Sequence, residues 1–117
     1  MTPNRPYLLR ALFDWILDNH MTPHLLVDAE AEDVHVPPQY IDNGKIVLNI
    51  SPSAVRQLEI GNETVSFSAR FGGRLFDISV PIKRVLAIYA KENGQGMVFS
   101  DEGGDEGGLE KPVKKTH

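Results

Sequence analysis

The first segment of the chain is almost entirely apolar apart from one narrow polar stripe. Arg5-Pro6 suits the first turn of a helix, and residues 7–19 are mostly good helix formers. Arg10, Asp14 and Asp18 recur every four residues, which predicts an Arg10–Asp14 pair across one helical turn. The remaining apolar arc is much wider than the roughly 100° of a surface helix. The helix is therefore either buried on several sides in its own domain or packed partly against a second subunit.

Alternating apolar and polar positions follow and predict β-strands. They lie at residues 24–28, 45–50, 64–71, 74–80 and 85–90, with a last short strand after Asn93-Gly94. Gly72-Gly73 joins two antiparallel neighbours. Residues 51–60 are expected to form one helical turn or an irregular crossing. The pattern predicts a mainly β fold, in which an N-terminal helix precedes a small, partly open barrel or sandwich of five to six strands.

The composition changes sharply after Ser100. The segment DEGGDEGGLEKPVKKTH has Leu109 and Val113 as its only large apolar residues, too few to offset the entropy of ordering. We expect a folded domain over residues 1–100 and a disordered, acidic and glycine-rich tail over residues 101–117. The tail holds three of the 12 basic and five of the 16 acidic residues, which leaves a nearly neutral domain. This balance argues against a nucleic-acid partner, which needs a clustered basic surface.

Several classes of protein are disfavoured. The chain has no cysteine, and its histidines at 20, 24, 35 and 117 share no metal-ligand spacing. No serine lies in a GxSxG motif, and Phe71-Gly72-Gly73 does not continue into a phosphate-binding GK[ST]. We expect a protein that is not an enzyme and needs no metal or cofactor. No apolar run approaches the roughly 20 residues that span a bilayer, and the start lacks a signal-peptide pattern, which predicts a cytoplasmic protein without membrane contact.

Four blocks of sequence together resemble the stringent starvation protein B (SspB) family. They are RPYLLRALFDWILDNHMTPHLLVD (5–28), IVLNISPSAV (46–55), FSARFGG (67–73) and VLAIYAKENGQGMVF (85–99), in order and with matching spacing. This family supplies the adaptor that delivers ssrA-tagged proteins to the ClpXP protease. The resemblance implies a homodimer of Sm-like barrel domains that pack through their N-terminal helices. Each subunit would hold an extended tag peptide in a surface groove.

The resemblance also implies which residues make these contacts. Ala69 would keep the groove floor shallow, Phe71 would cover small apolar tag residues, and Arg70 would pair with a tag carboxylate. The alternation from Val65 to Phe71 also allows Phe67, Ala69 and Phe71 simply to face the core, and both interpretations hold if the groove opens onto the edge of the core. The implied peptide-binding set is Phe67, Ala69, Arg70, Phe71, Gly72 and Gly73, with Ser51, Pro52, Ser79, Val80 and Pro81 as further candidates. The implied dimer interface is Tyr7, Leu8, Ala11, Leu12 and Trp15.

The tail departs from the family pattern. SspB tails are usually longer and end in a stretch of the type RPxLRVVK, which docks on ClpX, whereas this chain ends in LEKPVKKTH. The docking motif has therefore diverged or been truncated. A different class of function, an Sm-like RNA-binding protein, is the alternative. It would need a basic face with interleaved aromatic residues, which the charge balance disfavours.

Overall fold

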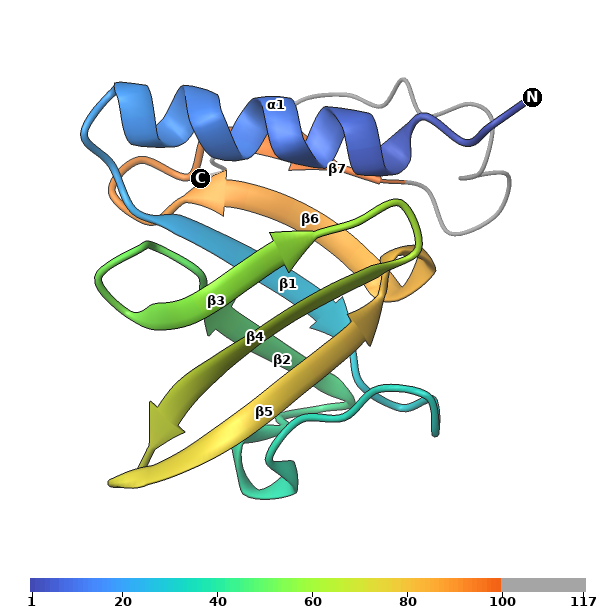
Figure 1. Cartoon of the computed structure of the whole chain (residues 1–117), viewed down its shortest axis with the longest axis vertical. Helices are drawn as coiled ribbons and strands as arrows, with labels where there is room; N and C mark the ends of the chain where they lie inside the picture. Colours follow the sequence, from blue (N-terminus) through green and yellow to red (C-terminus); the bar gives the residue numbers. More distant parts are fainter. Residues whose placement is uncertain (100–117) are drawn as a thin grey trace.

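The structure, a computed structural model, describes residues 1–99, and these form one α-helix and seven strands in two antiparallel sheets (Figure 1). One sheet has the strand order β2-β1-β6-β7 and the other β3-β4-β5. The helix lies across one end of the two sheets. The expected mainly β, partly open fold with an N-terminal helix is thus confirmed. The predicted tail, residues 101–117, lies outside the described residues.

Most element bounds follow the sequence pattern closely. The strands are β1 (Pro23–Asp28), β2 (Lys45–Asn49), β3 (Val55–Ile60), β4 (Thr64–Phe71), β5 (Arg74–Pro81), β6 (Val85–Ala90) and β7 (Gly96–Val98). The helix α1 spans Arg5–Asp18, and two short 3-10 helices, η1 (Pro38–Tyr40) and η2 (Ile82–Arg84), precede β2 and β6.

Strand β3 is the element that the sequence pattern missed. Residues 51–54 do form a turn, but residues 55–60 form a strand rather than a helical turn or an irregular crossing, and this raises the strand number from six to seven. Arg56 pairs with Ser68 and Glu59 with Ser66, so two residues of β3 face one residue of β4. Gln57, inside this bulge, has a left-handed φ of 57°. The extra residue shifts the alternation by one position, and this hides the strand in the sequence.

Helix α1 divides its apolar residues between the core and solvent. Leu9 and Ile16 are fully buried, while Leu8, Leu12 and Phe13 pack against the core from partly exposed positions. Arg10 does not pair with Asp14 as expected. Its guanidinium instead donates to the Ile60 carbonyl at 2.8 Å and to the Asn62 side chain at 3.0 Å, which ties the helix to the turn after β3.

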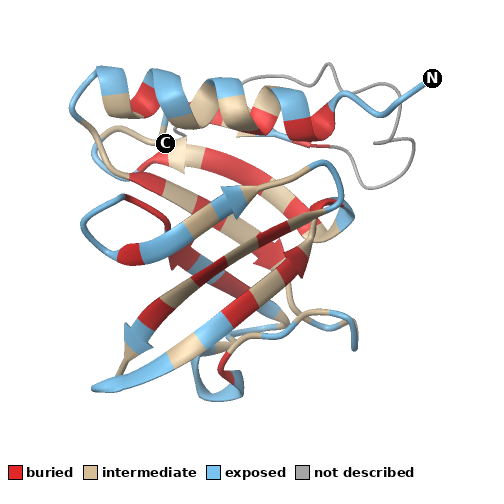
Figure 2. Cartoon of the chain, viewed as in Figure 1, coloured by how far each residue is buried: buried red, intermediate tan, exposed pale blue. Residues whose placement is uncertain are grey.

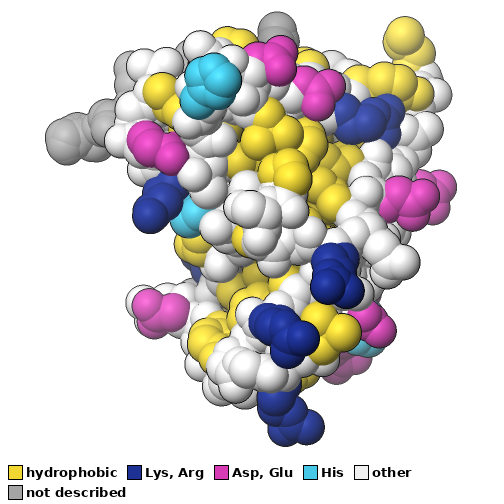
Figure 3. All heavy atoms as spheres, turned by 60° about the vertical axis from the view of Figure 1, so that its left-hand side comes forward, with side chains coloured by type: hydrophobic (Ala, Val, Ile, Leu, Met, Phe, Trp, Pro, Cys, Tyr) yellow, Lys and Arg dark blue, Asp and Glu magenta, His cyan; other side chains and the backbone are white. Residues whose placement is uncertain are grey.

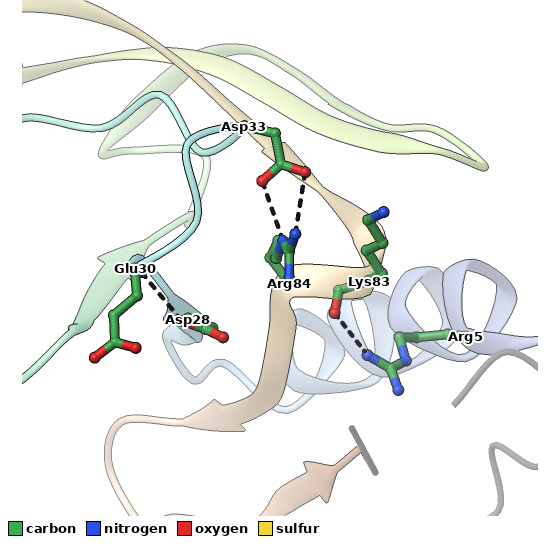
Figure 4. Close-up of polar contacts among 6 residues, drawn as sticks. All are labelled: Arg5, Asp28, Glu30, Asp33, Lys83 and Arg84. Atoms are coloured by element: carbon green, nitrogen blue, oxygen red, sulfur yellow. Dashed lines mark hydrogen bonds and ion pairs between the residues drawn. The ribbon is translucent and has the colours of Figure 1, made fainter. Parts of the chain in front are cut away.

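The core fills the space between the two sheets beneath the helix (Figure 2). At the start of α1, the buried Arg5 donates to the Val85 carbonyl at 3.0 Å. It also donates to the Lys83 carbonyl at 3.4 Å (Figure 4). Its guanidinium also lies 5.0 Å from the centre of the Phe99 ring. Beside this contact, Arg84 pairs with Asp33 at 3.1 Å and lowers the pKa of that carboxyl. The Arg84–Asp33 pair is exposed, so we expect it to contribute little to the stability of the fold.

Candidate peptide-binding groove

The β4–β5 hairpin closes with a two-residue turn that requires glycine. Gly72 and Gly73 have φ values of 59° and 84°, and positive φ at both central positions is the mark of a type I′ turn. Phe71 and Arg74 are the pair that flanks this turn. The turn also brings two backbone positions without side chains next to a cluster of aromatic rings.

The core-facing side of β4 becomes more exposed toward this turn. Val65 is 0% exposed, Phe67 4% and Ala69 8%, and Phe71 is half-buried. All four residues share one parity along the strand, so they lie on the same face of the sheet. Phe67 and Ala69 therefore belong to the core, and the core opens to solvent beyond them.

Ala69 is the last buried residue on this face of β4. It is paired with Val55 on β3 and with Phe76 on β5. The Val55 N–H donates to the Ser51 carbonyl at 3.2 Å, so the Ser51-Pro52 turn is held beside β3 next to Ala69. The Ser51-Pro52 turn thus leads into the strand that pairs with Ala69, and the contact of Ser51 and Pro52 with a peptide stays a prediction.

Three aromatic rings form one wall of the opening. The ring of Phe71 lies 5.2 Å from that of Tyr40 and 6.0 Å from that of Phe76, measured between ring centres. We call Tyr40, Phe71 and Phe76 the aromatic cluster. A Cβ added to Gly72 would lie 3.1 Å from the Tyr40 hydroxyl, so Gly72 also leaves room for that side chain. Tyr40 comes from η1, and sequence analysis missed it because nothing local connects that loop to β4.

Arg70 and Gly73 lie away from the groove floor. Arg70 is on the opposite face of β4 from Ala69, is exposed, and donates to the Gly73 carbonyl at 3.4 Å. Nothing lies within 4 Å of a Cβ added to Gly73. The proposed contact of Arg70 with a tag carboxylate would have to form at the rim of the groove.

The three further candidates on β5 are not brought to the aromatic cluster. Ser79 has both its backbone N–H and its carbonyl bonded to His35, at 3.1 and 2.8 Å. Val80 is fully buried opposite Val65, and Pro81 pairs with Thr64 at the far end of the strand. These residues lie at the end of β5 that is far from the glycine turn. Their contact with a peptide stays a prediction.

A second candidate surface runs along the outer side of α1. Tyr7 is 50% and Trp15 46% exposed, and Ala11 between them is exposed as well. The four-residue spacing puts all three on one stripe. Figure 3 shows apolar side chains gathered in the upper half of the molecule, below acidic side chains at its top. Leu9 and Ile16 turn into the core of the same domain, while this stripe faces solvent. The contact of the stripe with a second subunit stays a prediction.

Metal-ligand clusters and membrane-spanning helices are both absent from the described residues. Among residues 1–99, no cluster of three or more His, Asp or Glu side chains is arranged to hold a metal ion. Within the same range, no helix combines the length and apolarity needed to cross a membrane.

Comparison with known proteins gives a consistent family. The family model described as stringent starvation protein B matches residues 3–116. A stringent starvation protein B homolog of Haemophilus influenzae is 48% identical over 101 residues, which cover 86% of this chain and 67% of that relative. Both matches include the strands and turns that form the groove. The chain therefore belongs to the SspB family.

Proposed function

We propose that this chain is a non-enzymatic adaptor that binds ssrA-tagged proteins and delivers them to the ClpXP protease. Membership of the SspB family supports an adaptor role in general. The observation that carries the finer proposal is the opening of the core beyond Ala69, beside the aromatic cluster and two turn glycines. An extended peptide fits such an opening because its apolar side chains reach the core edge while its backbone approaches the glycines without collision. The family match gives no support to the RNA-binding alternative.

We further propose that two copies of the chain dimerise through α1. The stripe of Tyr7, Ala11 and Trp15 is exposed, and small Ala11 lets a second helix approach closely. Partly buried Leu8 and Leu12 flank the stripe and widen the apolar surface. A two-fold contact of this kind uses the same patch on both subunits.

The whole chain would then consist of a tag-binding and dimerisation domain, residues 1–100, and a tail, residues 101–117, that tethers it to ClpX. We place the protein in the cytoplasm, with no cofactor. The docking half of this proposal depends on whether LEKPVKKTH still contacts ClpX.

Fluorescence anisotropy of a labelled ssrA peptide, with a labelled poly-U oligomer as the comparison, tests this function. We expect the peptide to bind and its affinity to survive moderate salt, because the groove is mainly apolar. Binding of the oligomer alone, with an affinity that collapses as salt rises, would favour the RNA-binding alternative.

A further inference from the structure

The outer edge of β5 carries open hydrogen-bonding groups at Leu75 and Asp77. The backbone N–H and carbonyl of Ser79 both bond to His35, so they point away from β4. Residues of a strand alternate in the side to which these groups point, and β4–β5 pairing has no register shift. Asp77 and Leu75, two and four positions from Ser79, therefore direct their N–H and carbonyl groups to the same outer edge.

The glycine turn gives the same result independently. In a two-residue hairpin the flanking pair, here Phe71 and Arg74, exchanges hydrogen bonds across the two strands. The next pair, Arg70 and Leu75, then exchanges no backbone hydrogen bonds. The same holds for the backbones of Ser68 and Asp77, which are joined only by the bond that the Ser68 hydroxyl donates to the Asp77 carboxylate. Within residues 1–99, no backbone bond outside the β4–β5 ladder reaches Leu75 or Asp77.

Pro37 explains why the outer edge of β5 is left open. The segment that bonds Ser79 through His35 runs antiparallel to β5, so Pro37 comes opposite Asp77. Proline has no N–H to donate, and the chain leaves the edge there and enters η1. Tyr40 at the end of η1 then packs on Phe71, which places the aromatic cluster beside the open edge.

We propose that the peptide binds as an added antiparallel strand on this edge, paired with Leu75 and Asp77. This inference rests on the function proposed above and adds the mode of recognition. The peptide residue opposite Phe76 would point to the same face as Phe76, toward the aromatic cluster, and would be apolar. Its two neighbours would each need a free main-chain N–H. The ligand class is therefore a short extended segment with an apolar residue between two residues that are not proline.

The length of the edge favours a peptide over a second copy of the chain. The His35–Ser79 bridge limits it at one end and the glycine turn at the other, which leaves Leu75 to Asp77. Three residues of strand span about 10 Å. Leu75 is 57% exposed and Asp77 is exposed, so the edge is accessible.

Proline and alanine substitutions at Leu75 test the proposal. The Leu75 N–H faces away from β4, so Leu75→Pro removes the open donor without removing a bond of the β4–β5 ladder. Leu75→Ala removes the side chain and keeps the donor. With a fluorescent ssrA peptide, we expect Leu75→Ala to bind within about twofold of wild type and Leu75→Pro to bind at least about tenfold more weakly. Equal peptide affinities of the two variants would contradict strand addition at this edge. A wild-type chain that binds no ssrA peptide would instead contradict the proposed function itself.

Amide hydrogen exchange of the wild-type chain gives a test that does not depend on the folding of a variant. We expect the Leu75 and Asp77 amides to exchange quickly in the free chain and at least about tenfold more slowly with saturating ssrA peptide. The Phe76 and Ser79 amides serve as controls, because both are already bonded in the free chain. Unchanged exchange at Leu75 and Asp77 in the bound chain would rule out strand addition at this edge.

Discussion

At the scale of single residues, Gly72 and Gly73 share a turn but differ in their surroundings. Both have positive φ, so alanine at either position costs about 1–2 kcal/mol in the left-handed region. Only at Gly72 would the added Cβ also crowd the Tyr40 hydroxyl. We expect Gly72→Ala and Gly73→Ala to lower the thermal midpoint to a similar degree, while Gly72→Ala alone also weakens ssrA-peptide binding. Equal peptide affinities of the two variants would mean that Tyr40 does not contribute to the groove.

Ala69 is the residue whose small size is expected to keep the floor of the proposed groove shallow. A longer side chain there would enter the opening between Val55 and Phe76. We expect Ala69→Gln to weaken peptide binding by at least about tenfold, or about 1.4 kcal/mol, without loss of fold or dimer. Ser68→Gln, on the opposite face of β4, is the matched control. Full affinity would remove Ala69 from the site, and unfolding would assign it wholly to the core.

The burial of His24 leads us to expect that the stability of the chain depends on pH. Its Nε2 atom is buried without a hydrogen-bond partner, and burial, with a smaller effect of Lys91, lowers the pKa of the imidazole. The unfolded chain therefore binds a proton at His24 more readily than the folded chain does. Neutral His24 makes its full contribution to the stability of the fold above the pKa that His24 has in the unfolded chain. This contribution is lost as the pH falls through the lower pKa of His24 in the folded chain.

Replacement of His24 tests this pH dependence. We expect the thermal midpoint of the wild type to fall between about pH 7 and pH 5, and His24→Phe to reduce that fall. Exposed His20, changed to Asn, serves as the control. An equal fall in the wild type and in His24→Phe would show that other groups set the pH dependence.

At the scale of elements, α1 has one side in the core and an exposed outer side. Its inner side is held by Leu9, Ile16 and the bond from Arg10 to the Ile60 carbonyl, so a change on the outer side leaves the domain folded. In a dimer through the outer stripe, Ala11→Glu would place like charges together in a desolvated contact, at a cost of several kcal/mol. We expect sedimentation to show a monomer, with Asp14→Ala as the control that stays dimeric. A dimeric Ala11→Glu variant at micromolar concentration would contradict the helix-mediated interface.

The sheet elements differ in how well the sequence predicted them. Strands β4 and β5 keep an unbroken period of two on both sides of a glycine pair, so their ends and their pairing were predictable. Strand β3 was not, because the bulge at Gln57 breaks its alternation. Likewise, nothing in the loop before β2 indicates that Tyr40 packs on Phe71, since that contact joins residues far apart in the chain.

At the scale of the whole molecule, the proposed tag binding and the proposed delivery would use different parts of the chain. The groove residues all lie within the described domain, so removal of residues 101–117 should leave peptide affinity within about twofold. DEGGDEGG, with its glycines and acidic residues, has the composition of an extended spacer. A spacer of this kind raises the effective concentration of a bound substrate near any enzyme that its end contacts.

Degradation of an ssrA-tagged substrate by ClpXP at limiting concentration measures the contribution of the tail. We expect the full chain to stimulate degradation weakly and the form lacking residues 101–117 not at all. The weakness follows from the lack of arginines and paired valines in LEKPVKKTH. Equal stimulation by the two forms would place the ClpX contact in the domain, and absence of stimulation by both would mean that the docking motif is missing.

The sequence by itself determined the features that depend on neighbouring residues. The helix, most of the strands and the glycine turn follow from local periodicity and local residue choice. The resemblance to the SspB family rests on four blocks of sequence. Only the tertiary structure decided which side of α1 enters the core, where β4 opens to solvent, and that Pro37 leaves the edge of β5 free. Those features depend on the packing of segments that are distant in the chain, and a local pattern carries no information about which distant side chain or backbone group will lie opposite.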